Sequence, residues 1–303
     1  GLFYAIYFIA CVSKIKVFDL GCTMVKSALI ICCFFVLCNA VPDILEFEVA
    51  NKYTQVYGEA GTHLEWLRGK DLAEPYIETF LSVSSPKKDA EYAWSIIDAN
   101  DEIVSEFEGG EASYMFTTLG NYKITLSEKA DDVVTSTSHD VVVKYVRREI
   151  RKLFPDDRND LMDAMKTLWT LEDEQGKLVY GEGYTSIFKL LTYHLDLAGD
   201  RICDHMHDGY GFISHHSALS LLFEKSLQVI DPKLSLPYWD YIYDIEEWVT
   251  TDVSRRWDFT QGELFTADYF GSTDPETHYI KDGRWQELQV PSIDILSPEE
   301  QKT

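Results

Sequence analysis

Two periods of apolar residues follow one another along the chain. From residue 41 to about residue 145, apolar side chains alternate with polar ones over short stretches, which is the period of half-buried β-strands. The clearest alternations are Leu45, Phe47 and Val49; Tyr92, Trp94 and Ile96; Tyr122, Ile124 and Leu126; and Val141, Val143 and Tyr145. Turn-forming stretches such as SSPKKD, FEGGEA and LGN separate them. Several short strands at this spacing predict a β-sandwich module over residues 41–148.

Beyond residue 150 the apolar period becomes that of an α-helix. The apolar faces are Leu161, Met165, Leu168 and Leu171 in a first predicted helix, Ile187, Leu190, Leu191, Leu197 and Ala198 in a second, and Leu219, Phe223, Leu227 and Ile230 in a third. Thr185 is the expected cap of the second helix, Gly199 ends it, and Pro232 follows the third. These helices predict a mainly α domain over residues 149–303, so the predicted fold class is α+β and multidomain.

The N-terminal residues have the composition of a targeting segment. Five of the six cysteines lie in the first forty residues and only Cys203 lies further along, which excludes a disulfide framework in the rest of the chain. The stretch MVKSALIICCFFVLCNA, from Met24 to Ala40, has a basic start, an apolar centre and a small-residue end, as secretory signal peptides do. We therefore expect a leader and signal peptide over residues 1–40, with the peptide at about 24–40, and a secreted, extracellular protein. A membrane anchor is the alternative.

The charge of the chain narrows the choice of partners. Its formal net charge is −24 at pH 7, which argues against nucleic acid and anionic membrane surfaces as partners and favours a protein that attracts cations, metal ions included. The apolar share of 46% is ample for a packed core.

Histidines are concentrated in the helical half. Four of the eight lie in the stretch HMHDGYGFISHH, residues 205–216. His194 and His216 each lie on the apolar face of a predicted helix, so both side chains point toward the interior. Buried imidazoles on two successive helices gain most by binding a metal ion. The third ligand is expected from the connecting loop, where His205 and His207 are both available.

Spacing alone does not choose the metal. Three imidazoles without a thiolate suit copper, zinc or iron. A structural zinc site is normally closed by a cysteine or a fourth ligand, and Cys203 is near enough in sequence to supply one. Spacing alone therefore does not exclude zinc as the metal.

The sequence around the histidines resembles a known family. His207 and His216, separated by eight residues and followed by SALSLLFEKSLQVIDPKLSLPYWDY, resemble the first copper-binding half of the tyrosinase family of type 3 copper proteins. The upstream YHLDLAG resembles the family's first ligand helix, and the likeness extends over about residues 150–285. The resemblance implies that His194, His207 and His216 are the copper ligands and that no further catalytic residue is needed.

The resemblance also assigns supporting roles. Residues in register with the family pattern, expected to pack and orient the helices, are Phe212, Phe223, Glu224, Pro237, Tyr238, Trp239 and Asp240. His205 and His215 are expected to be neighbours of the ligands or alternative ligands. Many members of the family have a cysteine two residues before the second histidine, in a thioether to it; His205 stands there instead, so no thioether is expected.

The second copper-binding half of the family pattern is missing. That half has the pattern H-x-x-x-H followed by a later H-H, whereas only His278 follows His216 in this chain. The mainly α domain is therefore expected to resemble an incomplete four-helix bundle of the type 3 copper proteins. It would hold one copper ion, where a complete protein holds two. We expect the chain to be a fragment that is inactive by itself.

The resemblance implies an oxidoreductase of the tyrosinase or catechol oxidase kind, including monooxygenase activity. Its partners would be dioxygen and a small phenolic substrate, because such proteins use dioxygen to oxidise phenols or catechols to quinones. One alternative is an oxygen binder of the hemocyanin type. Another is a secreted, non-catalytic binding protein whose copper half is degenerate.

The N-terminal strands have a resemblance of their own. The stretch from YAWSIIDANDE to GNYKITL resembles the immunoglobulin-like repeat of the polycystic-kidney-disease type. That resemblance implies a binding or spacer module without chemistry, with protein or carbohydrate as its partner.

Overall fold

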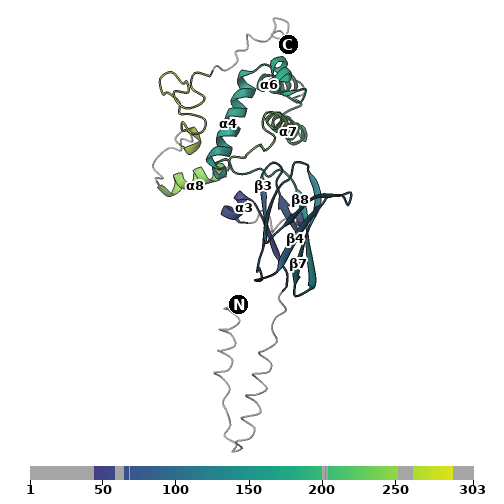
Figure 1. Cartoon of the computed structure of the whole chain (residues 1–303). Coiled ribbons are helices and arrows are strands. Elements are labelled where there is room, and N and C mark those ends of the chain that lie inside the picture. Colours follow the sequence, from purple (N-terminus) through teal and green to yellow (C-terminus); the bar gives the residue numbers. More distant parts are fainter. Residues whose placement is uncertain are drawn as a thin grey trace, which may run out of the picture. The chain divides into compact units, whose positions relative to one another are not determined.

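The computed structural model describes residues 44–58, 65–67, 69–199, 202, 204–251 and 262–288. The chain divides into two units, residues 1–46 and 47–303, and the helices and strands drawn in colour belong to the second (Figure 1). The predicted leader and signal peptide and Cys203 lie outside the described residues. None of the helices among the described residues is long and apolar enough to span a membrane.

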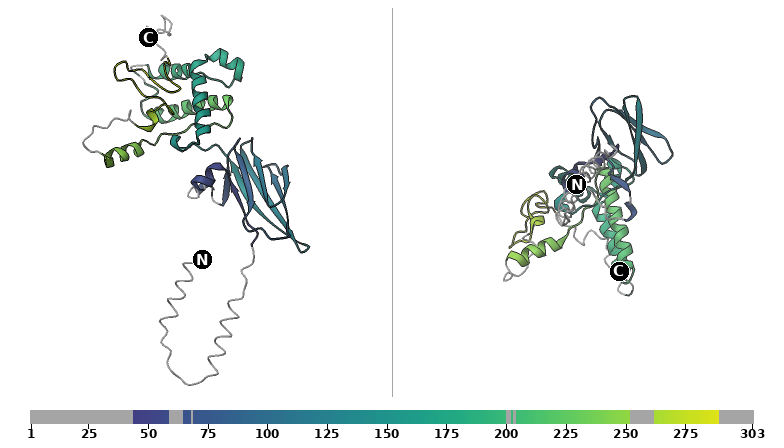
Figure 2. Two further views of the ribbon diagram at one scale, coloured as in Figure 1. Left: turned by 60° about the vertical axis from the view of Figure 1, so that its left-hand side comes forward. Right: turned by 90° about the horizontal axis from the view of Figure 1, so that it is seen from below.

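The N-terminal part of this unit is built from two β-sheets. The first sheet has the antiparallel strand order β1-β3-β6, and the second has the order β2-β8-β7-β4-β5, in which only β2 and β8 are parallel. The strand bounds are β1 Phe47–Ala50, β2 Lys70–Ala73, β3 Glu78–Val83, β4 Glu91–Ile97, β5 Ile103–Glu108, β6 Glu111–Met115, β7 Gly120–Ala130 and β8 Val133–Val143. Figure 2 shows these strands in two further views.

The predicted alternation places apolar side chains between these sheets. Trp94 and Ile96 of β4, with Ile124 and Leu126 of β7, are almost fully buried, whereas their polar neighbours face outward. The Phe47 ring from the first sheet meets the Trp94 ring of the second edge-on, with 5.2 Å between ring centroids. The two sheets therefore enclose a common core, as the sequence pattern predicts.

The C-terminal part is helical, which confirms the α+β layout. Its helices are α4 Pro155–Thr170, α5 Asp173–Tyr180, α6 Ile187–Ala198, α7 Gly211–Ile230 and α8 Tyr241–Thr251, with short 3-10 turns at Ile150–Lys152 and Glu263–Phe265. One further helix, α3 Lys52–Tyr57, and a 3-10 turn at Glu65–Leu67 lie between β1 and β2 of the N-terminal part. Ser186, rather than Thr185, caps α6, because its side chain accepts from the backbone N of Lys189. α4 packs against α7, and α7 against α6.

A buried cluster holds these helices together. Its members come from α4, α7 and the connecting segments: Leu161, Ala164, Leu168, Tyr184, Leu227 and Leu234. Gly176 of α5 lies directly against the Tyr184 ring, and a Cβ added to it would come within 2.0 Å of that ring. The glycine is therefore required by close packing.

The two ligand helices differ from the prediction in how much apolar surface they bury. Leu190 of α6 is buried, but Leu191 and Leu197, predicted as part of the same buried face, are each 40% exposed. Leu195 and Ile213 are exposed further, at 55% and 68%. Among the described residues α6 and α7 form a packed pair whose other side is open, and a four-helix bundle is not established by them.

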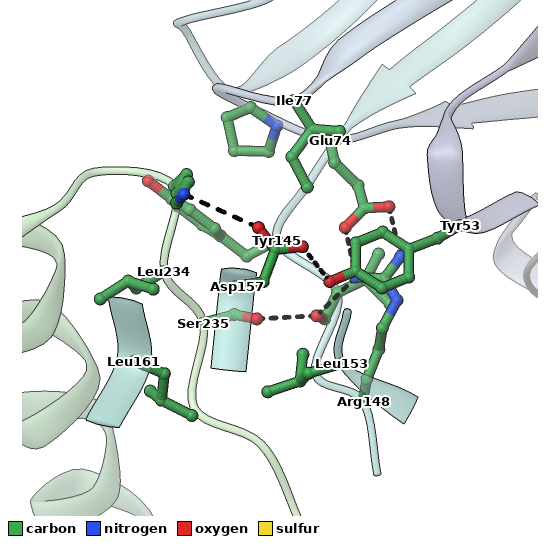
Figure 3. Close-up of a pocket in the computed structure, with 13 residues that line it drawn as sticks. Tyr53, Glu74, Ile77, Tyr145, Arg148, Leu153, Asp157, Leu161, Leu234 and Ser235 are labelled. Atoms are coloured by element: carbon green, nitrogen blue, oxygen red, sulfur yellow. Dashed lines mark hydrogen bonds and ion pairs between the residues drawn. The ribbon is translucent and has the colours of Figure 1, made fainter. Parts of the chain in front are cut away.

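A polar network joins the sheet region to α4. The Tyr53 hydroxyl donates to Asp157, and the guanidinium of Arg148 forms a paired contact with Glu74 while lying 3.7 Å from the centre of the Tyr53 ring. Figure 3 shows these side chains around a cavity of about 30 Å³, which is the size of one water molecule. The sheets are thus bonded to the helical part through buried charges rather than tethered to it by a linker alone.

Candidate metal centre

Three histidines from three successive elements converge. His194 lies on α6, His207 in the α6–α7 connection and His216 on α7. One nitrogen from each lies within 4.8 Å of the others, and the ring centroids are 5.2, 5.5 and 5.6 Å apart. The structure thus brings together the three residues that the family resemblance assigns as ligands, and it places His207 rather than His205 in the group.

A buried serine sets the position of α6 against α7. The Ser226 hydroxyl on α7 donates to the carbonyl of Thr185 and accepts from the Thr185 backbone N, at 2.7 and 2.8 Å. Thr185 lies nine residues before His194, and Ser226 lies ten after His216. In an antiparallel helix pair these nearly equal distances bring the two histidines opposite each other.

The loop ligand is held by an aspartate three residues before it. One carboxylate oxygen of Asp204 accepts from the backbone N atoms of Met206 and His207, at 2.8 and 2.9 Å. The other lies 2.7 Å from Nδ1 of His207. The hydrogen bond from His207 is also the main reason that the pKa of Asp204 lies below its usual value. Met206 is buried under this turn.

The hydrogen bonds select which ring nitrogen faces the centre. A carboxylate and a carbonyl can only accept, so Nδ1 of His207 carries its proton toward Asp204, and Nδ1 of His216 carries its proton toward the Phe212 carbonyl, 2.8 Å away. Nε2 of both rings is then the basic nitrogen. Metal-bound histidines almost always donate their other N–H to a carboxylate or carbonyl in this way.

The two additional histidines fasten the loop to α7. Nδ1 of His215 lies 2.6 Å from the carbonyl oxygen of His205. Gly211 makes this approach feasible, because a Cβ there would come within 2.6 Å of the same oxygen. Neither His205 nor His215 belongs to a group of metal-binding geometry among the described residues. They are neighbours of His207 and His216 in the chain, and their predicted role beside the ligands stays a prediction.

Glu224 of α7 is a buried carboxylate with hydrogen-bond partners from outside its own helix. It is 5% exposed and accepts from Arg147 and from the backbone N of Leu236. Burial by itself raises the pKa of Glu224, but these hydrogen bonds outweigh burial and lower it. Phe223 packs against the helical core.

The remaining predicted supporting residues are more exposed than core residues. Tyr238 is 54% exposed and Trp239 38%, which corrects the expectation that both are packed inside. Tyr238 acts through its backbone, which bonds to that of Arg148 and Ile150. The Trp239 indole N donates to Asp244 at 2.6 Å.

The other three are also at or near the surface. Phe212 is exposed and lies against the His216 ring, with 4.7 Å between centroids. Asp240 is partly exposed; its carbonyl accepts from Arg151 and its carboxylate from the backbone N of Ile242. Pro237 is partly exposed as well.

Sequence reasoning missed three residues that shape the centre. Asp204, Ser226 and Arg147 each hold a ligand or a ligand helix in place. The spacing of Asp204 to His207 is the signal that was available, because an aspartate readily accepts from backbone N atoms two and three residues later. The partners of Ser226 and Arg147 are distant in sequence, at separations of 41 and 77 residues, and leave no local pattern.

The geometry fits a single metal ion. Nitrogen–metal bonds of about 2.0–2.1 Å place two ligand nitrogens at most about 4.2 Å apart, so small ring rotations close the observed spread of 4.8 Å. An apolar cavity of about 350 Å³ adjoins the centre and is lined by His194, Met206, Leu197, Leu219 and Leu222 among others. Three imidazoles beside an apolar wall suit copper or zinc.

Comparison with known proteins adds one sequence match. Residues 181–300, which include all three histidines, match the family model of the common central domain of tyrosinase. No curated protein matches the chain.

Solved structures give only weak likenesses. A β-glucuronidase from Ruminococcus gnavus is 20% identical over 24% of this chain, with a TM-score of 0.21, and only 14% of that structure is covered. A family 76 glycoside hydrolase from a bovine Bacteroides thetaiotaomicron strain is 15% identical, with a TM-score of 0.24. The match covers 52% of this chain and 37% of the hydrolase chain. The CARDB domain of a Pyrococcus furiosus protein is 14% identical over 36% of this chain and 96% of its own, with a TM-score of 0.18. TM-scores this low do not establish a common fold.

The family match and the converging histidines concern the same stretch of chain. Residues 181–300 are therefore similar in sequence to the common central domain of tyrosinase.

Proposed function

We propose that the histidine triad binds one copper ion and forms half of the centre of a copper oxidoreductase that uses dioxygen to oxidise phenols or catechols to quinones. The observation that carries this proposal is the convergence of His194, His207 and His216 inside a region that matches the tyrosinase family. The imidazole donors support it, because imidazole binds both Cu(I) and Cu(II).

The roles of the protein residues follow from their contacts. Copper supplies the redox chemistry when it is bound, and the chain supplies its ligands and their surroundings. His194 and His216 present nitrogens from two helices, and the hydrogen bonds at His207 and His216 engage Nδ1, which leaves Nε2 of both rings available to a metal ion. Apolar side chains, Leu197, Leu219 and Leu222 among them, line the cavity beside His194.

One copper ion is not enough for the proposed reaction. Oxidation of a catechol to a quinone releases two protons and two electrons, whereas a single copper ion cycles between states that differ by one electron. A second copper site is therefore needed, and the described residues contain one group of metal-binding geometry. We accordingly propose that this 303-residue chain takes up at most one copper and turns catechol over negligibly.

Metal titration tests this function. The chain is expected to bind one copper per molecule, and alanine at His194, His207 or His216 is expected to abolish tight binding. His278→Ala is the matched control, because His278 does not belong to the converging group of histidines. Copper uptake that survives all three ligand substitutions would contradict the proposal, and a clear preference for zinc in competition would replace copper chemistry with a zinc site.

The extracellular location is a proposal of its own. It is supported by the signal-peptide plan of residues 24–40. A reporter fused after Ala40 is expected to enter the medium of a secreting cell with the segment removed. A reporter retained whole in the membrane would favour the anchor instead.

A further inference from the structure

We infer that Asp204 is the positioning residue for the copper ligand His207, holding the backbone and the ring of that histidine at once. This inference rests on the proposed copper site. It concerns the one ligand of the three that no helix carries.

His207 lies in a loop, so no helix orients its side chain as α6 and α7 orient those of the other two ligands. His194 and His216 inherit the direction of their side chains from α6 and α7, and both are partly buried. The His207 side chain is 46% exposed and lies in a turn between the helices. Without a partner, its ring would sample several rotamers, and the entropy of fixing it would weaken metal binding.

The Asp204 carboxylate removes this freedom with three hydrogen bonds. Its Oδ1 accepts from the backbone N atoms of Met206 and His207, which fixes the turn, and its Oδ2 accepts from Nδ1 of His207, which fixes the ring. Since the same carboxylate makes all three bonds, the ring is oriented relative to its own backbone. The basic Nε2 then faces His194 and His216, whose rings lie 5.2 and 5.6 Å from that of His207.

The turn itself is anchored to α7. His215 donates to the carbonyl of His205, which lies between Asp204 and Met206 in the chain, and Gly211 allows the close approach. Two independent contacts therefore hold the turn, one to its own ligand and one to the helix that carries His216. These contacts position the loop before any metal ion is bound.

Substitution of Asp204 by asparagine removes the hydrogen bond to the His207 ring and keeps the hydrogen bonds to the backbone of the turn. An Asn oxygen still accepts from the two backbone N atoms, but its NH₂ group cannot accept from Nδ1 of His207. We expect Asp204→Asn to weaken Cu(I) binding about 10- to 100-fold, as loss of such partners does at other metal sites. Asp208→Asn is the matched control, because it removes the same charge one residue after His207 from an exposed side chain.

The affinities are measured on the 303-residue chain by competition with a chromophoric Cu(I) chelator, alongside His207→Ala. Asp204→Asn binding as tightly as the unsubstituted chain, with His207→Ala weak, overturns the positioning role and leaves the copper site standing. Equal binding by the unsubstituted chain and His207→Ala overturns the copper site itself. A weakening by Asp208→Asn as large as that by Asp204→Asn also overturns the role, because charge alone then explains both.

A second readout needs no metal. In nitrogen-15 spectra of the metal-free chain at about pH 8, above the ordinary histidine pKa of about 6.5, His207 is expected to carry its proton on Nδ1. Asp204→Asn is expected to shift the population toward Nε2–H, whereas Asp208→Asn leaves it unchanged. An Nε2–H tautomer in the unsubstituted chain contradicts the inference whatever the copper affinities are.

Discussion

The guanidinium of Arg147 forms a two-pronged ion pair with the buried carboxylate of Glu224, at 2.9 and 2.5 Å. Arg147 follows the last strand of the sheet region, and Glu224 lies on α7 eight residues after His216, about two turns along the same helix. The pair therefore connects the end of the β-rich region directly to the helix that carries a predicted copper ligand.

Removal of the arginine is expected to destabilise the fold. Arg147→Met leaves Glu224 buried with only the backbone N of Leu236 to stabilise its charge. We expect a loss of about 1–3 kcal/mol in the free energy of unfolding, at the lower end because the arginine itself is half-exposed. Urea unfolding measures this loss. Lys225→Met, on the exposed face of α7, is the control, and an equal effect of the two substitutions would argue against a specific pair.

The same carboxylate is expected to make stability depend on pH. Burial raises the pKa of Glu224 and of Asp157, but hydrogen bonds from Arg147 to the first and from Lys52 and Tyr53 to the second outweigh it, so both values are lowered. The folded chain then binds fewer protons than the unfolded chain, and the stabilisation is present at neutral pH. It is lost as the pH falls below the ordinary carboxyl pKa of about 4 and through the lowered folded values.

Urea unfolding at a series of pH values from neutral to acid tests this dependence. Glu224→Gln should be less stable than the unsubstituted chain at neutral pH, and the two curves should converge in acid. Parallel curves over the whole range would mean that Glu224 does not contribute to the pH dependence.

Gly176 is expected to tolerate no side chain. Alanine is the better helix former by about 1 kcal/mol, but its Cβ would overlap the ring of the fully buried Tyr184. Displacement of that ring also strains its hydrogen bonds to the Thr167 and Leu171 carbonyls. We expect Gly176→Ala to lose about 2–4 kcal/mol in thermal or urea unfolding. Gly110→Ala, whose added Cβ would lie 3.9 Å from the Tyr92 ring, should be close to neutral.

Copper is expected to stabilise the chain against heat. A ligand that binds only the folded state adds about 2.7 kcal/mol at one hundred times its dissociation constant. Differential scanning calorimetry should therefore show a higher Tm with copper, reversed by a chelator, and no rise for His207→Ala. A rise that persists in His207→Ala would place the bound copper elsewhere on this acidic chain.

The candidate ligands could be predicted from the sequence because helix periodicity and the family resemblance are both read from residues close together in the chain. The spacing of His194 and His216 from neighbouring leucines places each on an inward face, and the pattern after His207 selects that residue over His205. The layout of β-rich and helical parts follows from the change of period near residue 150. Each of these inferences depends on residues close together in the chain.

What the sequence could not provide depends on distant residues. A periodic stripe shows which side of a helix is apolar but not what covers it, so Leu191 and Leu197 were expected inside and are partly exposed. Tyr238 and Trp239 look like core residues by type, yet their role in the fold runs through main-chain atoms and a surface hydrogen bond. Ion pairs such as Arg147 with Glu224 have no sequence signature at all.

Ser226 is expected to affect both stability and metal binding. Ser226→Ala removes the hydroxyl that pairs with the backbone N and the carbonyl of Thr185, and it leaves two backbone groups with their partner lost in a buried place. The expected loss is about 1–3 kcal/mol in the free energy of unfolding. Because the same hydroxyl sets α6 against α7, copper affinity should fall as well, although Ser226 lies ten residues from His216. Ser217→Ala, at an exposed position next to His216, is the control and should change neither quantity. If Ser226→Ala lowers stability but binds copper as tightly as the unsubstituted chain, the serine stabilises the helix pair without setting the positions of the ligands.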